Sequence, residues 1–285
     1  MPAPLIPIGQ LIDRTWEYYR QNLSDLLSIS GWILLTAIFS IVGLAMYPDV
    51  TTLASGAALS GSEIAGTVIL FLNSSVFAPV IGLWVLCAIT RFMAGSKGSA
   101  AAKEGWRYFW PAVAVSVLVQ LMMLGGLFIG FGPAIVFLIL AWLLNNSALL
   151  LLGNFLLVLG VFASTVIVLR WVGFYILSPY SLLLENIRGK AALKQSRALV
   201  EGRFWSVITR YALPKLFFVV VGIVIMTMLQ YVVNIMISAA AGLNLDVQLR
   251  LLSIASAVIP TVLAALMNPL VVISDVLLYN NLKGR

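Results

Sequence analysis

The densest group of charged side chains lies between residues 182 and 205, in "LLLENIRGKAALKQSRALVEGRFW", which holds five cations and two acids between apolar runs. If this stretch is helical, Lys190, Lys194, Arg197 and Glu201 share one narrow face. Such a face fits a helix lying on a membrane surface, and recognition of anionic lipid headgroups is the functional alternative, with about 1 kcal/mol of attraction per nearby cation. No nucleic-acid-binding motif accompanies the charges, so we expect no nucleic-acid partner.

Arg170 and Asp275 are the charged residues within or beside long apolar segments. Charges inside a bilayer are costly and often functional. Both residues lie toward one end of their segments, where the charged group can reach the membrane–water interface, and this explains their presence without a function. The alternative is an intramembrane polar site in which Arg170 pairs with Asp275.

Several kinds of chemistry are excluded by what the chain lacks. The sequence has no His and a single Cys, Cys87, which lies in an apolar run. A disulfide within the chain, a Cys/His zinc site and a Ser-His-Asp triad are therefore excluded. No phosphate-binding, dinucleotide-binding or H-E-x-x-H motif is present. We expect neither enzymatic activity nor a cofactor or metal.

The composition indicates a membrane protein. Hydrophobic residues make up 62% of the 285 positions and charged residues 9%. Soluble domains carry about 45–50% apolar residues and roughly 25% charged residues. The N-terminus lacks the basic region of a signal peptide, so the first apolar segment is expected to act as an uncleaved insertion signal.

Six apolar segments are long enough to cross a bilayer, which takes about 20 residues. No charged residue lies between Arg107 and Arg170, and "NNS" at 145–147 is the best break in that stretch. A kink or break at Pro133 or Pro179 would give seven or eight spans. We adopt six in an all-α transmembrane bundle: 26–47, 64–90, 111–143, 148–170, 214–238 and 251–279.

The distribution of Lys and Arg predicts the orientation. Fifteen of these residues lie on one side of the predicted spans, whereas the opposite loops hold one, Arg250. By the positive-inside rule, both termini and the two basic loops are expected to be cytoplasmic.

Internal similarity predicts three parallel repeats in a single integral membrane domain, 1–285. "LLLENIRGK" at 182–190 resembles "LLYNNLKGR" at 277–285. Each repeat is expected to be a cytoplasmic amphipathic helix followed by a membrane hairpin, although any two membrane–cytoplasm junctions look somewhat alike. In the N-terminal helix, Ile8, Ile12, Trp16, Tyr19 and Leu23 form the expected interfacial face. The repeats are 8–95, 96–189 and 190–285.

A family resemblance accompanies these junctions. In "RWVGFYILSPYSLLLENIRGKAALKQSRALVEGRFWSVI" the family-like positions are Arg170, Glu185, Gly189, Ala192, Leu193, Ser196, Leu199, Gly202 and Trp205. "IGQLIDRTWEYYRQN" and "LLYNNLKGR" are also similar. The chain resembles bacterial six-helix membrane proteins related to the membrane domain of glycerophosphoryl diester phosphodiesterase, including YciC-like proteins. The family's phosphodiesterase activity belongs to a separate soluble barrel with acid, His and metal-binding residues. The resemblance therefore implies a multi-pass protein of the bacterial plasma (inner) membrane without that activity.

These observations leave two functional expectations. The first is a non-enzymatic membrane scaffold, envelope-maintenance or partner-binding protein, with membrane lipids as partners. The second is a transporter or permease component for a small molecule or lipid. A water-accessible cavity lined by Arg170, Asp275 and buried amides favours transport, whereas open surface grooves favour a scaffold or lipid binding.

Overall fold

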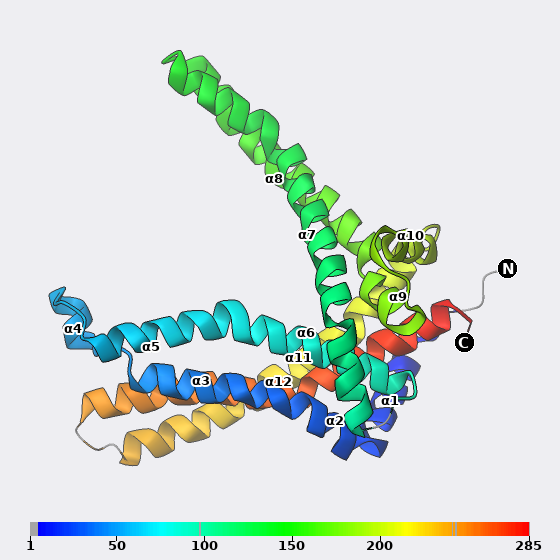
Figure 1. Ribbon diagram of the computed structural model, residues 1–285. Coiled ribbons are helices and arrows are strands. Elements are labelled where there is room, and N and C mark those ends of the chain that lie inside the picture. Colours follow the sequence, from blue (N-terminus) through cyan, green and yellow to red (C-terminus); the bar gives the residue numbers. More distant parts are fainter. Residues whose placement is uncertain (1–4, 97, 241, 243, 285) are drawn as a thin grey trace. The chain divides into compact units, whose positions relative to one another are not determined.

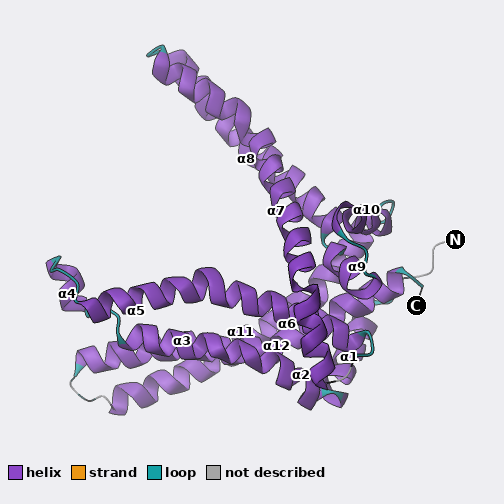
Figure 2. Cartoon of the chain, in the orientation of Figure 1, coloured by secondary structure: helices purple, strands orange, loops and turns teal. Residues whose placement is uncertain are grey.

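The computed structural model describes residues 5–96, 98–240, 242 and 244–284, and all regular structure in them is helical (Figures 1 and 2). Within these described residues, six helical segments are long and apolar enough to cross a membrane. The all-α, six-span prediction is therefore confirmed, and the chain is a multi-pass membrane protein. The segments are Leu23–Ala45, Gly61–Met93, Gly98–Leu143, Ser147–Glu185, Phe204–Ala240 and Leu245–Leu282.

The chain forms two compact units. The first comprises Met1–Phe109 and Arg210–Arg285, and the second Trp110–Thr209. Two helices contribute to both: α7 (Gly98–Leu143) and α11 (Phe204–Ala240). The three-fold repeat stays a prediction.

In the first unit, two broken helices form the first two spans. One consists of α2 (Leu23–Ser30), a 3₁₀ turn (Gly31–Ile33) and α3 (Leu34–Ala45); α4 (Val50–Ser55) follows in the loop. The other consists of α5 (Gly61–Leu72), a π turn (Asn73–Phe77) and α6 (Ala78–Met93).

The π turn precedes Pro79, which cannot donate a backbone hydrogen bond. Asn73 in this turn is buried, and its amide donates to the carbonyl of Thr36 and to Ser40 Oγ, each at 2.9 Å. The side chain therefore bonds one span to the other, as expected for amides between membrane helices.

The core of the first unit lies around the C-terminal half of α12 (Leu245–Leu282), where Leu270, Ile273 and Val276 are buried. Helix α1 (Ile8–Gln21) packs on α12.

The buried residues of α1 are Leu11, Thr15 and Tyr19, whereas Trp16 is 53% exposed. The expected interfacial face is thus divided, because one side of the helix is needed for packing against α12. Its placement at a membrane surface stays a prediction.

In the second unit, α7 and α8 (Ser147–Tyr175) lie side by side and are joined at the predicted "NNS" break (Figure 1). Asn145 has a positive φ of 48°, a conformation that Asn tolerates better than most residues. The side chain of Asn146 accepts hydrogen bonds from the backbone N–H groups of Ala148 and Leu149 and so caps α8.

Glycines bring α7 and α8 into backbone contact. A Cβ on Gly130 would lie 2.6 Å from the Cβ of Ser164, and one on Gly160 would lie 2.6 Å from the carbonyl oxygen of Gly130. These residues form the small-residue contact that lets membrane helices approach closely. Gly130 belongs to the glycine-rich run "GGLFIGFG" at 125–132, and its close contact with α8 explains a glycine at this position.

The third long helix begins before Pro111, where the third span was predicted to start. Helix α7 is continuous from Gly98 through Pro111 and Pro133, for 46 residues. At about 1.5 Å per residue it is about 70 Å long, whereas a bilayer core is about 30 Å thick. The surface helix expected before Pro111 is therefore the first part of α7. Membrane-type helices accommodate proline where neighbouring groups satisfy the freed backbone.

Candidate functional site

The basic helix predicted from the sequence is α10 (Gly189–Val200), and it packs on α8 and on α9 (Ser178–Glu185). Its buried side is made of small and apolar residues: Ala192, Leu193, Ser196 and Val200. This packing leaves Lys190, Lys194 and Arg197 on the exposed side, so the structure brings the three predicted cations together.

Ser196 fixes α10 to the interruption between α8 and α9. Its hydroxyl donates to the carbonyl of Phe174 at 2.7 Å and accepts from the backbone N–H of Leu177 at 3.2 Å. Ser178 Oγ donates to the carbonyl of Tyr175 at 2.6 Å. Pro179 lacks an N–H, so serine side chains satisfy carbonyls that a continuous helix would have satisfied with its own backbone.

The first groove of the second unit lies between α7, α8 and α10, and we call it the basic groove. Its volume is about 440 Å³. Three cations stand on its α10 wall, and apolar side chains of α7 form the opposite wall. The lining residues are Leu118, Leu121, Met122, Tyr175, Lys190, Leu193, Lys194 and Arg197.

The second groove lies between α8 and the beginning of α11, and we call it the aromatic groove. Its volume is about 490 Å³, and its lining residues are Val166, Leu169, Arg170, Phe174, Phe204, Trp205 and Ile208. The rings of Phe174 and Phe204 are 5.3 Å apart, and those of Phe204 and Trp205 5.4 Å apart. Gly173 faces the Phe204 ring and Ile208 with no room for a Cβ, which allows Phe204 to approach α8.

Phe174 connects the two grooves. The guanidinium carbons of Arg170 and Arg197 each lie 5.7 Å from the centroid of its ring. The two cations are therefore no farther apart than twice that distance. Arg197 also approaches Glu201, with Nη2 and Oε1 3.6 Å apart and both side chains more than half exposed, so this ion pair is weak.

Asp275 has an ionic partner that sequence reasoning missed. Its side chain is 3% exposed, and its Oδ2 lies 2.9 Å from Nζ of Lys215 on α11. The same Nζ lies 3.3 Å from the centroid of the Tyr211 ring. The structure thus pairs Asp275 with Lys215 and places Arg170 over the ring of Phe174. The alternative in which Arg170 pairs with Asp275 would join the two units, and it stays a prediction. The i, i+4 spacing of Tyr211 and Lys215, which places them on one face of a helix, was the available signal for the site at Lys215. It was missed because the fifth span was predicted to begin at 214, so that Tyr211 lay outside it.

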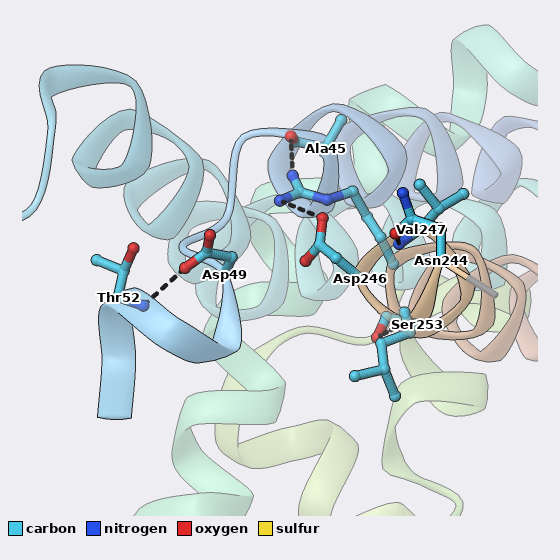
Figure 3. Close-up of polar contacts among 9 residues, drawn as sticks. Ala45, Asp49, Thr52, Asn244, Asp246, Val247 and Ser253 are labelled. Atoms are coloured by element: carbon cyan, nitrogen blue, oxygen red, sulfur yellow. Dashed lines mark hydrogen bonds and ion pairs between the residues drawn. The ribbon is translucent and has the colours of Figure 1, made fainter. Parts of the chain in front are cut away.

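A small pocket of about 160 Å³ with a largely apolar lining lies in the first unit, where α3 ends and α12 begins. Figure 3 shows the polar contacts around it. Arg250 donates to the carbonyl of Ala45 at 2.6 Å, and its Nη2 lies 3.9 Å from Asp246 Oδ2. Asp49 accepts from the N–H of Thr52 at 2.7 Å. Arg250 thus caps the end of α3, and Asp49 caps the beginning of α4. The capping role explains why Arg250 is present on the side with few cations.

Among the described residues, no group of three or more His, Cys, Asp or Glu side chains is close enough to hold a metal ion. No family model, curated protein or solved structure matches the chain. The resemblance to the phosphodiesterase-related membrane family therefore stays a prediction. The class that the fold defines is a six-span, all-helical membrane protein.

Proposed function

We propose that the protein is a non-enzymatic scaffold of the bacterial plasma membrane that binds anionic phospholipid on its cytoplasmic side. The basic groove carries this proposal. Lys190, Lys194 and Arg197 line one wall and apolar side chains line the other. An anionic phospholipid has the same arrangement, with a phosphate next to acyl chains.

The charge state of the basic groove supports an anionic occupant. Within the described part of the chain, neither Lys190 nor Lys194 forms an ion pair, and the one ion pair of Arg197 is its weak contact with Glu201. A phosphate beside these residues would gain charge-assisted hydrogen bonds, which are the stronger kind. The Lys and Arg distribution predicts that this groove faces the cytoplasm, where anionic lipids give the leaflet its negative potential.

The shape of the grooves favours a lipid-binding scaffold over a transporter. Both grooves are open, and their walls are largely apolar.

A transporter or permease component is the second candidate. The buried Lys215–Asp275 pair favours it, since ionisable groups within spans often mark ion or proton pathways.

Lipid binding is testable with the purified full-length protein. The groove variant carries Lys190→Gln, Lys194→Gln and Arg197→Gln. The control variant carries Arg14→Gln, Arg20→Gln and Lys103→Gln, which remove the same amount of charge at exposed positions of the first unit. Binding to nanodiscs containing phosphatidylglycerol is measured at fixed ionic strength. The groove variant should bind at least about tenfold more weakly, given about 1 kcal/mol per cation. Equal losses in the two variants would indicate nonspecific attraction and reject the proposal.

A further inference from the structure

We infer that the preferred lipid is a diphosphatidyl glycerol, with one phosphate bound at Arg170 and the other at Arg197. This inference rests on the proposed function and names the lipid class. It starts from the two grooves that meet at Phe174, which have similar volumes of about 440 and 490 Å³. Each is largely apolar and contains one of the two arginines that contact the Phe174 ring.

The spacing of the two arginines suits two phosphates in one molecule. Their guanidinium carbons are each 5.7 Å from one ring centroid. Hydrogen bonds from arginine to phosphate are about 2.7–2.9 Å long. Two guanidinium groups that share one ring can therefore reach two phosphates that are joined by a three-carbon glycerol bridge. Phe174 holds both arginines before the lipid arrives, which reduces the ordering cost of binding.

The charge balance also favours a dianion. Four cations line the two grooves together: Arg170, Lys190, Lys194 and Arg197. Among the described residues, the linings contain no acid. A lipid with one phosphate would leave most of this charge uncompensated in either groove. A lipid with two phosphates places one negative charge in each.

The apolar walls of the two grooves can contact the acyl chains of both halves of the diphosphatidyl glycerol. Leu121 and Met122 continue the basic groove along α7, and Leu169 and Ile208 continue the aromatic groove along α8 and α11. Trp205, which lines the aromatic groove, is 75% exposed, as expected for an indole at the headgroup level of a membrane. A soluble bisphosphate would leave these walls unused.

The test compares diphosphatidyl glycerol with phosphatidylglycerol at equal total phosphate in nanodiscs. The wild-type protein should bind one diphosphatidyl glycerol at least about tenfold more tightly, since a second linked contact raises affinity without a second association step. Arg170→Gln should remove this preference and leave phosphatidylglycerol binding within about twofold of wild type, because the basic groove keeps its three cations. Lys103→Gln serves as the matched control and should retain the preference. Thermal unfolding in detergent checks that each variant is folded.

Three outcomes would overturn the inference. Equal affinity per phosphate for the two lipids would show that the grooves act separately. A preference that survives Arg170→Gln would remove the aromatic groove from the site. Equal competition by water-soluble glycerol-1,3-bisphosphate would identify a phosphate site without lipid specificity. In each case phosphatidylglycerol binding by the basic groove would still support the proposed function, whereas loss of all anionic-lipid binding by the wild type would reject both.

Discussion

Removing the carboxylate of Asp275 should destabilise the protein strongly. The side chain is 3% exposed, and its partner Lys215 is 20% exposed at 2.9 Å. Asp275→Asn leaves the lysine charge without its counter-ion in a largely buried place. Breaking a buried pair in this way costs about 3–5 kcal/mol. Because the Lys215 side chain is partly exposed and also contacts the ring of Tyr211, we expect about 3 kcal/mol, the lower end of that range.

Removing both charges should cost much less. The variant Lys215→Met with Asp275→Asn keeps the side-chain volumes similar and leaves no unpaired ion, so its stability should lie within about 1.5 kcal/mol of wild type. The free energies of unfolding of the wild type, both single variants and the double variant form a double-mutant cycle. They are measured in detergent by the loss of helical circular dichroism. Additive single effects would refute the reasoning, because the two residues would then not be coupled.

The second unit and the predicted topology allow three more tests. Gly160→Val should separate α7 from α8 and lower stability by about 1–3 kcal/mol, as overpacking does, since a Cβ there meets the carbonyl oxygen of Gly130 at 2.6 Å. The control is Gly132→Val, where a Cβ has open space. Equal losses of stability in the two variants would contradict the close contact. Ser196→Ala should leave the carbonyl of Phe174 without its 2.7 Å hydrogen bond, cost about 1–3 kcal/mol and weaken lipid binding. Ala198→Ser, at an exposed position of the same helix, is its control and should change neither; unchanged unfolding and binding in Ser196→Ala would mean that Ser196 does not position α10. Reporter fusions at Gly56 and Asn146 should report outside and those at Gly98 and Gly202 inside, and a cytoplasmic result at Asn146 would contradict the six-span topology.

Residue pattern predicted the spans well because helix length and apolar composition are local properties. The break at 145–147 was predictable for the same reason: two asparagines and a serine interrupt an otherwise apolar run, and Asn146 then caps α8. The continuity of α7 through Pro111 was not predictable. A proline only disfavours a helix, and the packing that compensates for it comes from residues distant in the sequence.

The candidate site was predicted only in part. Lys190, Lys194 and Arg197 were found because their spacing places them on one helical face. The apolar wall of α7 was missed because Leu121 and Met122 lie far from these cations in sequence. Lys215 was counted with the loop cations because its partner, Asp275, is 60 residues away, and the pairing depends on how α11 packs on α12.

The interruption of α8 gives the second unit both its grooves. Pro179 ends the hydrogen-bond pattern, and Ser178 and Ser196 satisfy the carbonyls of Tyr175 and Phe174. These two aromatic residues line different grooves, Phe174 the aromatic one and Tyr175 the basic one, because neighbouring helical residues point about 100° apart. If α8 continued as a straight helix, α10 would lose its attachment through Ser196, and Arg197 would lose its place beside Phe174. The lipid-binding proposal therefore depends on this break as much as on the cations themselves.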